Sequence, residues 1–379
     1  MDVQSHAGFE RQPMNVVFRV DASIQMGTGH VMRCLTLAEE LRRFGHRCIF
    51  ICREHTGNLG DLIENKGFFI HLLSALSGFN PALESDNTAH AEWLGVSWRI
   101  DAEQTLVALD AMKVDWLIID HYALDARWER LLAKAVGQIM VIDDLADRDH
   151  ACDLLLDQNL GREVGDYDYK VPNHCVRLVG PRYALLRPEF AELRETSLQR
   201  RVKPKVKRIL ITLGGVDANN ITGKVLNTLA NSFLPRTTEL DIVMGATAPH
   251  LEEIRELSNR LPFQAKVSVN VNDMAERMRL ADISIGAAGS TSWERCCLGL
   301  PSIIVILAEN QRAIGNALAK NGCAHLIIDD QAIQSVGSLL SKLMASEVQL
   351  IKLTHNAKSI CDGRGCSRLI LKIIRKISS

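Results

Sequence analysis

The sequence of 379 residues lacks several features that mark whole classes of proteins. Its formal net charge is only −1, so no bulk electrostatic attraction to nucleic acid or to an anionic membrane is expected. No apolar stretch is long enough to cross a bilayer without charged residues or helix breakers. Residues 1–13 are polar and lack the apolar segment of a secretory signal, which favours a cytoplasmic location.

The 10 cysteines do not have the paired spacing of a zinc framework. We therefore expect buried, reduced thiols. The acidic segment 142–157 also lacks the glycine and the ligand spacing of a calcium loop. The sequence thus predicts no metal site and no cofactor.

Extended apolar runs alternate with segments of helical periodicity along most of the chain. The run 114–120 is almost continuously apolar, which is typical of a strand covered on both faces of a parallel sheet. The segment 186–207 breaks this pattern, because it is charged and contains prolines, and the alternation restarts at residue 208. We therefore predict an α/β protein with a disordered extension at 1–13, domains at 14–190 and 208–379, and a linker at 191–207. The basic amphipathic helix at the end of the chain is expected to pack across the two domains.

The segment QMGTGHVMRC, residues 25–34, contains a glycine turn between an expected strand and an expected helix. Met32 stands where a dinucleotide fingerprint requires glycine, and no Walker lysine follows, so neither type of nucleotide loop is predicted. Gly27, Thr28 and Gly29 instead form a turn whose backbone can approach a substrate closely. His30 lies in the first turn of the helix, where the partial positive charge disfavours the imidazolium.

A neutral imidazole at the carboxyl end of a parallel strand can act as a general base, although His30 could equally serve only to cap its helix. Asp21 ends the strand before this turn and could orient His30 or bind a sugar hydroxyl, but turn aspartates are common. Asp120 and Tyr122 end another strand and would lie at the same edge of the sheet. Tyr122 could hydrogen-bond a polar substrate, whereas a capping role for Asp120 is at least as well supported. We take Asp21, Asp120, Tyr122 and the glycine turn as substrate-binding candidates.

A second glycine turn, LGGVDANN at 213–220, also precedes an expected helix. Gly214 and Gly215 permit close approach of the backbone, and the helix that begins near Asn219 can receive phosphate oxygens. We take Gly214, Gly215 and Asp217 as nucleotide-binding candidates. The alternative is that Asp217 only caps the turn.

The segment 285–305 places a turn of small residues between a strand and a short helix. The amides of Gly289, Ser290 and Thr291 could bind a diphosphate, and the Glu294 carboxylate could accept both ribose hydroxyls. The spacing of Thr291 and Glu294 also fits a capping box, which is the structural alternative. Two further nucleotide-binding candidates end the next strand, Asn310 and Gln311.

Four stretches together resemble the UDP-sugar hydrolase family of pseudaminic acid biosynthesis: FRVDASIQMGTGHVMRCLTLAEEL, IIDHYALD, ITLGGVDANNIT and GAAGSTSWERCCLGLPSIIVILAENQ. That family cleaves UDP-2,4-diacetamido-2,4,6-trideoxy-β-L-altropyranose, and the resemblance runs from Met14 to the last helix. It implies two Rossmann-like domains facing a cleft, the glycosyltransferase-B fold, similar to the lipid-intermediate GlcNAc transferase of peptidoglycan synthesis. It also implies UDP binding on the second domain and sugar chemistry on the first, with His30 in the place of the family's catalytic histidine. Trp293 stands where some relatives carry asparagine, so we assign it no catalytic role.

The implied reaction is an inverting, metal-independent attack of water on the anomeric carbon, with His30 as the base. Because UDP is already a good leaving group, the paired carboxylates of ordinary glycosidases are not required. The first alternative is a glycosyltransferase of the same fold, in which His30 deprotonates an acceptor hydroxyl. A nucleotide-sugar-binding protein without catalysis is the second alternative, and a UDP-sugar epimerase ranks lower. The expected partner is a small UDP-sugar rather than a nucleic acid or a membrane.

Overall fold

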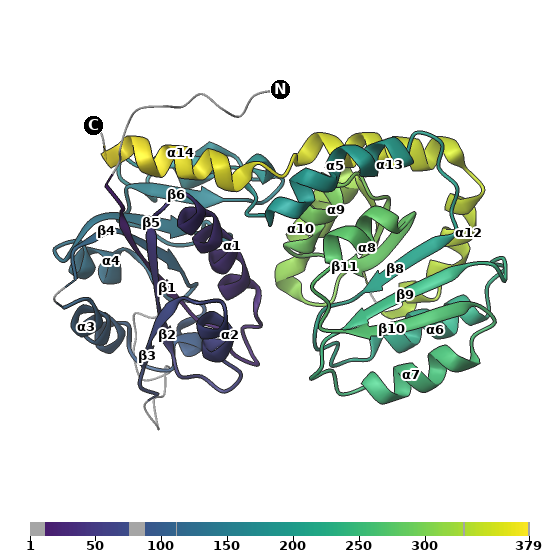
Figure 1. Ribbon diagram of the computed structural model, residues 1–379, viewed down its shortest axis with the longest axis horizontal. Coiled ribbons are helices and arrows are strands. Elements are labelled where there is room, and N and C mark those ends of the chain that lie inside the picture. The colour runs from purple at the N-terminus through teal and green to yellow at the C-terminus, as the bar shows by residue number, and fades with distance from the viewer. Residues whose placement is uncertain (1–11, 76–87, 111, 329, 378–379) are drawn as a thin grey trace. The chain divides into compact units, whose positions relative to one another are not determined.

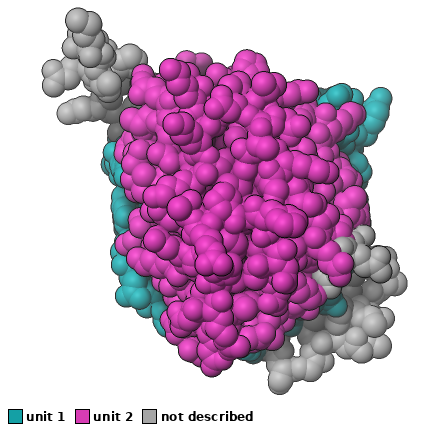
Figure 2. Space-filling view, turned by 90° about the vertical axis from the view of Figure 1, so that its right-hand side faces the viewer, with its two compact units in different colours: residues 1–157, 163–178 teal, residues 158–162, 179–379 magenta. Residues whose placement is uncertain are grey.

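A computed structural model describes residues 12–75, 88–110, 112–328 and 330–377 of the chain (Figure 1). The chain divides into two compact units, which Figure 2 shows in different colours. The first unit comprises residues 1–157 and 163–178, and the second comprises residues 158–162 and 179–379. Each unit is a Rossmann-like α/β domain built around its own parallel sheet, as the sequence predicts.

Seven strands form the sheet of the first unit, in the order β3-β2-β1-β4-β5-β6-β7. They are β1 (Asn15–Val20), β2 (Arg47–Arg53), β3 (Phe69–Leu73), β4 (Val114–Asp120), β5 (Val136–Ile142), β6 (Leu154–Asp157) and β7 (Val176–Val179). The strand order reverses between β1 and β4, because β2 and β3 lie on one side and the later strands on the other. In open α/β sheets, ligands bind at such a switch point, beyond the carboxyl ends of the strands.

The pairing of β1 with β4 sets the polar ends of these two strands side by side. Val20 is the register partner of Asp120, and the two strands run parallel. Every residue of β4 except Asp115 is buried, which accounts for its nearly continuous apolar sequence. The residues that follow β1 and β4 therefore emerge at the same edge of the sheet.

Helices connect these strands: α1 (Gly29–Arg43), α2 (Gly60–Asn65), α3 (Trp98–Leu109), α4 (Ala126–Leu132), and the 3-10 helices η2 (Ala91–Leu94) and η3 (Val164–Tyr167). Helix α1 buries an apolar stripe with helical spacing, formed by Val31, Cys34, Leu35, Ala38 and Leu41. It ends in a Schellman motif, in which Gly45 adopts a left-handed φ of 83° and donates its N–H to the carbonyl of Arg42.

Six strands form the sheet of the second unit, in the order β10-β9-β8-β11-β12-β13. They are β8 (Arg208–Thr212), β9 (Glu239–Met244), β10 (Gln264–Val269), β11 (Ile283–Ala287), β12 (Ser302–Val305) and β13 (Ala324–Ile327), and all five pairings are parallel. Here the strand order reverses between β8 and β11. Alternate residues of β8 enter different apolar clusters, because Ile209 and Ile211 pack on one side and Leu210 on the other.

The helices of the second unit are η4 (Pro181–Tyr183), α5 (Pro188–Arg200), α6 (Ile221–Ala230), α7 (Leu251–Arg260), α8 (Met274–Leu280), α9 (Thr291–Cys297), η5 (Glu309–Gln311), α10 (Arg312–Lys320), α11 (Asp330–Ile333), α12 (Val336–Met344), α13 (Glu347–Ile360) and α14 (Gly365–Ile377). Helix α14 belongs to the second unit. Its expected packing across both domains stays a prediction.

The expectation of a linker at 191–207 is wrong for most of that segment. Residues 188–200 form α5, which groups with the second unit and contacts α8 and α9. Pro188 occupies the first helical position, where proline starts rather than breaks a helix. Phe190 and Ser197 are buried on a narrow face, so a mostly charged sequence still forms a packed helix.

All cysteines are free in the structure, and every one except Cys48 is buried. This agrees with the expected buried thiols. Among the described helices, none combines the length and the apolar character needed to cross a membrane.

Candidate active site

His30 is the second residue of α1, immediately after the turn that leaves β1. The turn is tight, because the N–H of Gly27 donates to the carbonyl of Ser23 at 2.8 Å and Gly27 has a left-handed φ of 76°. A Cβ at Gly27 or Gly29 would meet no heavy atom of the described residues within 4 Å, so this face of the turn is open. Thr28 is exposed, and its side chain does not cap α1. The turn therefore leaves room for a ligand beside His30.

Asp120 holds the imidazole of His30 from the end of β4. Its Oδ1 lies 2.6 Å from Nδ1 of His30. Nearby guanidinium and imidazole groups hold the pKa of the Asp120 carboxyl well below its usual range, against the effect of burial. An ionised carboxylate only accepts hydrogen bonds, so Nδ1 must donate. The neutral ring then has its lone pair on Nε2, which makes no hydrogen bond within the described residues.

Arg33, one turn further along α1, fixes Asp120 in turn. Its Nε and Nη2 donate to the two carboxylate oxygens of Asp120, each at 2.6 Å, and its Nη1 donates to Asp144 at 2.6 Å. Asp144 also accepts the hydroxyl hydrogen of Tyr122 at 2.8 Å. The Tyr122 ring meets the His30 ring edge to face, with 4.7 Å between centroids. The orientation of His30 is thus fixed by four side chains from three segments of the chain.

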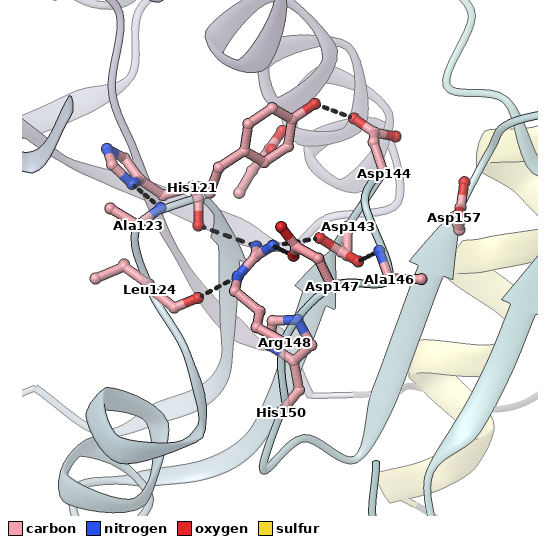
Figure 3. A network of polar contacts seen from close by, with 12 residues as sticks. His121, Ala123, Leu124, Asp143, Asp144, Ala146, Asp147, Arg148, His150 and Asp157 are labelled. Atoms are coloured by element: carbon pink, nitrogen blue, oxygen red, sulfur yellow. Dashed lines mark hydrogen bonds and ion pairs between the residues drawn. The ribbon is translucent and has the colours of Figure 1, made fainter. Parts of the chain in front are cut away.

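Arg148 ties the loop after β4 to the loop after β5 (Figure 3). Its Nε donates to the carbonyl of Leu124 at 2.8 Å, and its Nη2 approaches the carbonyl of His121 at 3.4 Å. Its Nη1 lies 2.9 Å from carboxylate oxygens of both Asp143 and Asp147. Because Tyr122 and Asp144 lie on these two loops, this bridge stabilises the positions of both side chains beside His30.

Asp21 does not orient His30, contrary to one of the sequence expectations. Its carboxylate is buried and accepts from Arg19 Nη1 and from the backbone N–H of Arg53, both at 2.6 Å. Its other oxygen lies 3.3 Å from Nε2 of His121 and 3.6 Å from Nε2 of His55. These contacts leave no exposed oxygen for a sugar. Asp21 therefore has a structural role, in which it holds Arg19, the backbone of Arg53 and His121 together below the site. Asp120 is also fully buried, and it acts on His30 rather than on a substrate.

An aromatic wall beside His30 has no signal in the sequence motifs. Trp93 of η2 is half-buried and stacks on Tyr122, with 5.6 Å between ring centroids. The ring of His90 lies 4.6 Å from that of Trp93 and 5.4 Å from that of Tyr122. The segment 25–29 is joined to this wall by the hydrogen bond from Gln25 to Glu92 at 3.0 Å.

In the second unit, Asp217 caps α6 instead of facing a nucleotide. Its two carboxylate oxygens accept from the N–H groups of Ile221 and Thr222, both at 2.8 Å, and Asn220 accepts from Gly223 at 3.1 Å. The first N–H groups of α6 are therefore already satisfied, and the expected phosphate site at this helix is filled by a carboxylate. The expectation that Asp217 binds a nucleotide is therefore wrong, and the alternative expectation, that it is a capping residue, is confirmed.

Gly214 and Gly215 remain open beside this capped turn. A Cβ on either residue would meet no described heavy atom within 4 Å, and neither amide N–H donates within the described residues. Gly214 has a left-handed φ of 95°, which favours glycine. The carbonyl of Gly215 accepts from Gly245 at 2.9 Å, which anchors the loop at its inner side. These two glycines keep the properties expected of a loop that binds phosphate.

The loop after β11 presents Gly289, Ser290 and Thr291. A Cβ at Gly289 would again meet open space, and Ser290 is exposed. Ser290 is the N-terminal cap position of α9, but no side chain caps this helix, so the capping box between Thr291 and Glu294 is absent. Glu294 is half-buried without a hydrogen bond or ion pair among the described residues, and burial raises its pKa to about 7 against the nearby arginines. Its carboxylate is therefore available to a ligand.

The last two candidates lie in η5. The side-chain oxygen of Gln311 accepts from the N–H of Leu307 at 3.1 Å, so it braces the end of β12. The side chain of Asn310 lies outside the described residues. Trp293, to which no catalytic role is assigned, is 1% exposed and packs in the core of the second unit.

The sequence of this chain is similar to those of several known proteins. Over 309 residues the chain is 25% identical to the UDP-2,4-diacetamido-2,4,6-trideoxy-β-L-altropyranose hydrolase of Campylobacter jejuni, which covers 82% of this chain and 97% of that protein. The chain is thus similar to that hydrolase over most of the length of both proteins. It is also 24% identical over 366 residues to the spore coat polysaccharide biosynthesis protein SpsG of Bacillus subtilis, covering 94% of this chain and 96% of that protein.

A further relative is an uncharacterized protein of Methanocaldococcus jannaschii, 27% identical over 304 residues and 79% of this chain. The chain spans 57% of that relative's length. Residues 208–363 match the family model described as the glycosyltransferase family 28 C-terminal domain. These residues include every nucleotide-binding candidate of the second unit.

Solved structures show the fold. MurG of Acinetobacter baumannii aligns with a TM-score of 0.69 at 15% identity, covering 96% of this chain and 100% of that one. The calicheamicin glycosyltransferase CalG4 aligns with a TM-score of 0.64 at 15% identity, covering 97% and 99%. The chain therefore has the glycosyltransferase-B fold, as the resemblance implied.

Proposed function

We propose that this protein is a hydrolase that releases UDP from a UDP-linked 2,4-diacetamido-2,4,6-trideoxyhexose. The observation that carries the proposal is the ring of His30, whose Nδ1 is held by Asp120 while Nε2 is left without a partner in the described chain. The homology to the Campylobacter hydrolase supports the substrate class.

In the proposed reaction, Nε2 of His30 takes a proton from a water molecule as the water oxygen bonds to the anomeric carbon. The bond between that carbon and the β-phosphate oxygen breaks, and UDP leaves with the electron pair. Asp120 stabilises the imidazolium that forms, and the proton then passes to solvent. The products are UDP and a free sugar of inverted anomeric configuration.

The proposed UDP ligands lie in the second unit. The open amides of Gly214 and Gly215, together with the loop at Gly289 and Ser290, would receive the diphosphate oxygens as negative charge develops on them. The carboxylate of Glu294, when ionised, would accept the two ribose hydroxyls. In the first unit, the half-buried ring of Trp93, backed by Tyr122, would pack against the apolar face of the 6-deoxysugar.

The first test is incubation of the protein with a panel of UDP-diacetamido-trideoxyhexoses in buffer without any acceptor. Mass spectrometry should detect UDP and free sugar, and in oxygen-18 water the released UDP should stay unlabelled because the carbon–oxygen bond breaks. His30→Ala should lower turnover by about 10²–10⁴-fold, the usual contribution of a general base. UDP affinity should be unchanged, because the proposed nucleotide ligands lie in the other unit.

His174→Ala is the matched control, since His174 also lies in the first unit but is 65% exposed and pairs only loosely with Asp153, at 3.4 Å. It should keep wild-type turnover. A His30→Ala protein with normal turnover would refute the role of His30, and oxygen-18 in UDP would refute attack at carbon.

A glycosyltransferase is the second candidate, because the structural neighbours MurG and CalG4 carry the same fold and CalG4 is a glycosyltransferase. In that case His30 would deprotonate an acceptor hydroxyl. The acceptor-free incubation distinguishes the two, since a transferase would leave the sugar nucleotide intact until an acceptor is added.

A further inference from the structure

Arg295 is a buried cation that makes no ion pair with any residue that the structure describes. It lies on α9, and it is 1% exposed. Its Nη2 donates to the carbonyl of Ala287 at 2.6 Å and to the hydroxyl oxygen of Ser292 at 3.0 Å. Its Nε and Nη1 find no acceptor among the described residues. In the first unit, the buried Arg19 and Arg53 each bond to the carboxylate of Asp101 instead.

A buried charge of this kind is costly unless an opposite charge compensates it. Burial lowers the pKa of Arg295 to about 10, so the side chain is still protonated near neutral pH. The neighbouring Glu294 attracts it but makes no ion pair with it, and because the pKa of Glu294 is raised to about 7, this carboxyl is only partly ionised near neutral pH. Within the described part of the chain, no carboxylate is therefore bonded to the Arg295 guanidinium.

The guanidinium lies at the switch point of the second sheet. Gly286 near the end of β11 is the register partner of Thr212 at the end of β8, and these are the strands between which the order reverses. A Cβ at Gly286 would overlap Nη1 of Arg295 and would lie 3.1 Å from the carbonyl oxygen of Thr212. Glycine at this position thus makes the space that Arg295 occupies. Ligands of open α/β sheets bind at this position.

Two loops with open glycines follow these same strands. Gly214 and Gly215 come after β8, and Gly289 comes after β11. The hydroxyl oxygen of Ser292 links Arg295 to the second loop, because it also accepts from the N–H of Gly289 at 3.3 Å. The guanidinium is therefore linked through Ser292 to a loop whose glycine leaves open space for a ligand.

We propose that Arg295 is the counter-charge of a nucleoside diphosphate bound by the loops at 214–215 and 289–290. The inference rests on the proposed function and adds the residue that makes the site selective for the diphosphate. Because the Arg295 side chain is buried, it acts as a positioning residue and does not touch the diphosphate. Its positive charge attracts the diphosphate, and its hydrogen bond to Ser292 holds the loop at Gly289. The bound diphosphate would supply the negative charge that no described residue pairs with Arg295.

The test measures UDP and uridine binding by calorimetry for the wild type, Arg295→Met and Arg295→Lys. Arg295→Met should weaken UDP binding by about 10–100-fold, the range of a charge-assisted interaction, and leave uridine binding unchanged. Arg295→Lys keeps the charge and should lose less. The thermal midpoint of unliganded Arg295→Met should equal or exceed that of the wild type, because an uncompensated buried charge has been removed.

Arg201→Met is the matched control. Arg201 is also buried in the second unit and has no carboxylate paired with it among the described residues. Unlike Arg295, however, it donates to four backbone carbonyls, including those of Met278 and Ala281, before β11 begins. Its loss should lower the thermal midpoint but keep the ratio of UDP to uridine affinity. Equal losses of UDP and uridine binding in Arg295→Met, or lost stability with an unchanged ratio, would overturn the proposal. A wild-type protein that does not bind UDP would overturn both this inference and the proposed function, whereas UDP binding without UDP release would overturn only the latter.

Discussion

Replacing Asp120 with asparagine tests how the site fixes the tautomer of His30. Asparagine has the shape of aspartate but offers one acceptor and one NH₂ donor in place of two acceptors. In the native site one carboxylate oxygen receives His30 Nδ1 and Arg33 Nη2, and the other receives Arg33 Nε. If the amide oxygen faces Arg33 Nε, the NH₂ group faces His30 and favours the tautomer with hydrogen on Nε2. If the amide oxygen instead faces His30, the NH₂ group faces the N–H of Arg33 Nε, so two donors meet and that hydrogen bond is lost.

Both orientations weaken the base, and both leave an imidazolium without its neighbouring charge. We therefore expect turnover to fall by about 10²–10⁴-fold, which corresponds to about 3–5 kcal/mol of transition-state stabilisation. Arg33 keeps Asp144 as a partner at 2.6 Å, so the free energy of unfolding should fall by only about 1–3 kcal/mol. The variant should remain folded at assay temperature.

The assay is the initial rate of UDP release, with UDP binding as the measure of intact structure. Asp125→Asn is the control, because Asp125 is also paired with an arginine in the first unit, at 2.7 Å from Arg127, but caps α4. Asp120→Asn with normal turnover and normal UDP binding would refute the tautomer argument. A loss of UDP binding equal to the loss of turnover would show a general structural defect instead.

Two other predictions concern the second unit. Burial raises the pKa of Glu294 to about 7 from 4.5. Between these two pH values the folded protein holds a proton that the unfolded chain releases. The contribution of this group to the free energy of unfolding is therefore lost as pH rises from about 4.5 to 7. UDP affinity should rise over pH 6–8, as the carboxylate ionises. Glu294→Gln should make both profiles less steep, in calorimetry and in pH-dependent melting, while the terminal phosphate of UDP and other protein groups still titrate. Variant profiles as steep as those of the wild type would contradict this. Asp217→Ala should lower the free energy of unfolding in urea by about 1–2 kcal/mol, because it removes the cap of α6 from a residue with a left-handed φ of 44°. Asp217→Asn should lose less, and a larger effect on UDP affinity than on stability would favour direct nucleotide contact.

Local sequence pattern was sufficient for the two sheets and for the position of His30. The apolar run of β4, the helical stripe of α1 and its closing Gly45 each depend on neighbours within one turn or one strand. Such signals report which face is buried and where the chain turns, so they survive without knowledge of the rest of the fold. The failure at α5 has the same origin, since a helix with a narrow buried face carries too weak a periodicity to distinguish it from a linker.

The partners of each site residue were decided only by the tertiary structure. The sequence indicated both Asp21 and Asp120 near His30, but the β1–β4 register, with Val20 beside Asp120, gives His30 to Asp120 and turns Asp21 toward Arg19. Motifs also could not identify Trp93, which reaches the site from a separate segment, or show that Arg295 pairs with no carboxylate in the part of the chain that the structure describes. Charge compensation depends on distances between residues far apart in the chain, and those distances follow from strand order and packing rather than from local spacing.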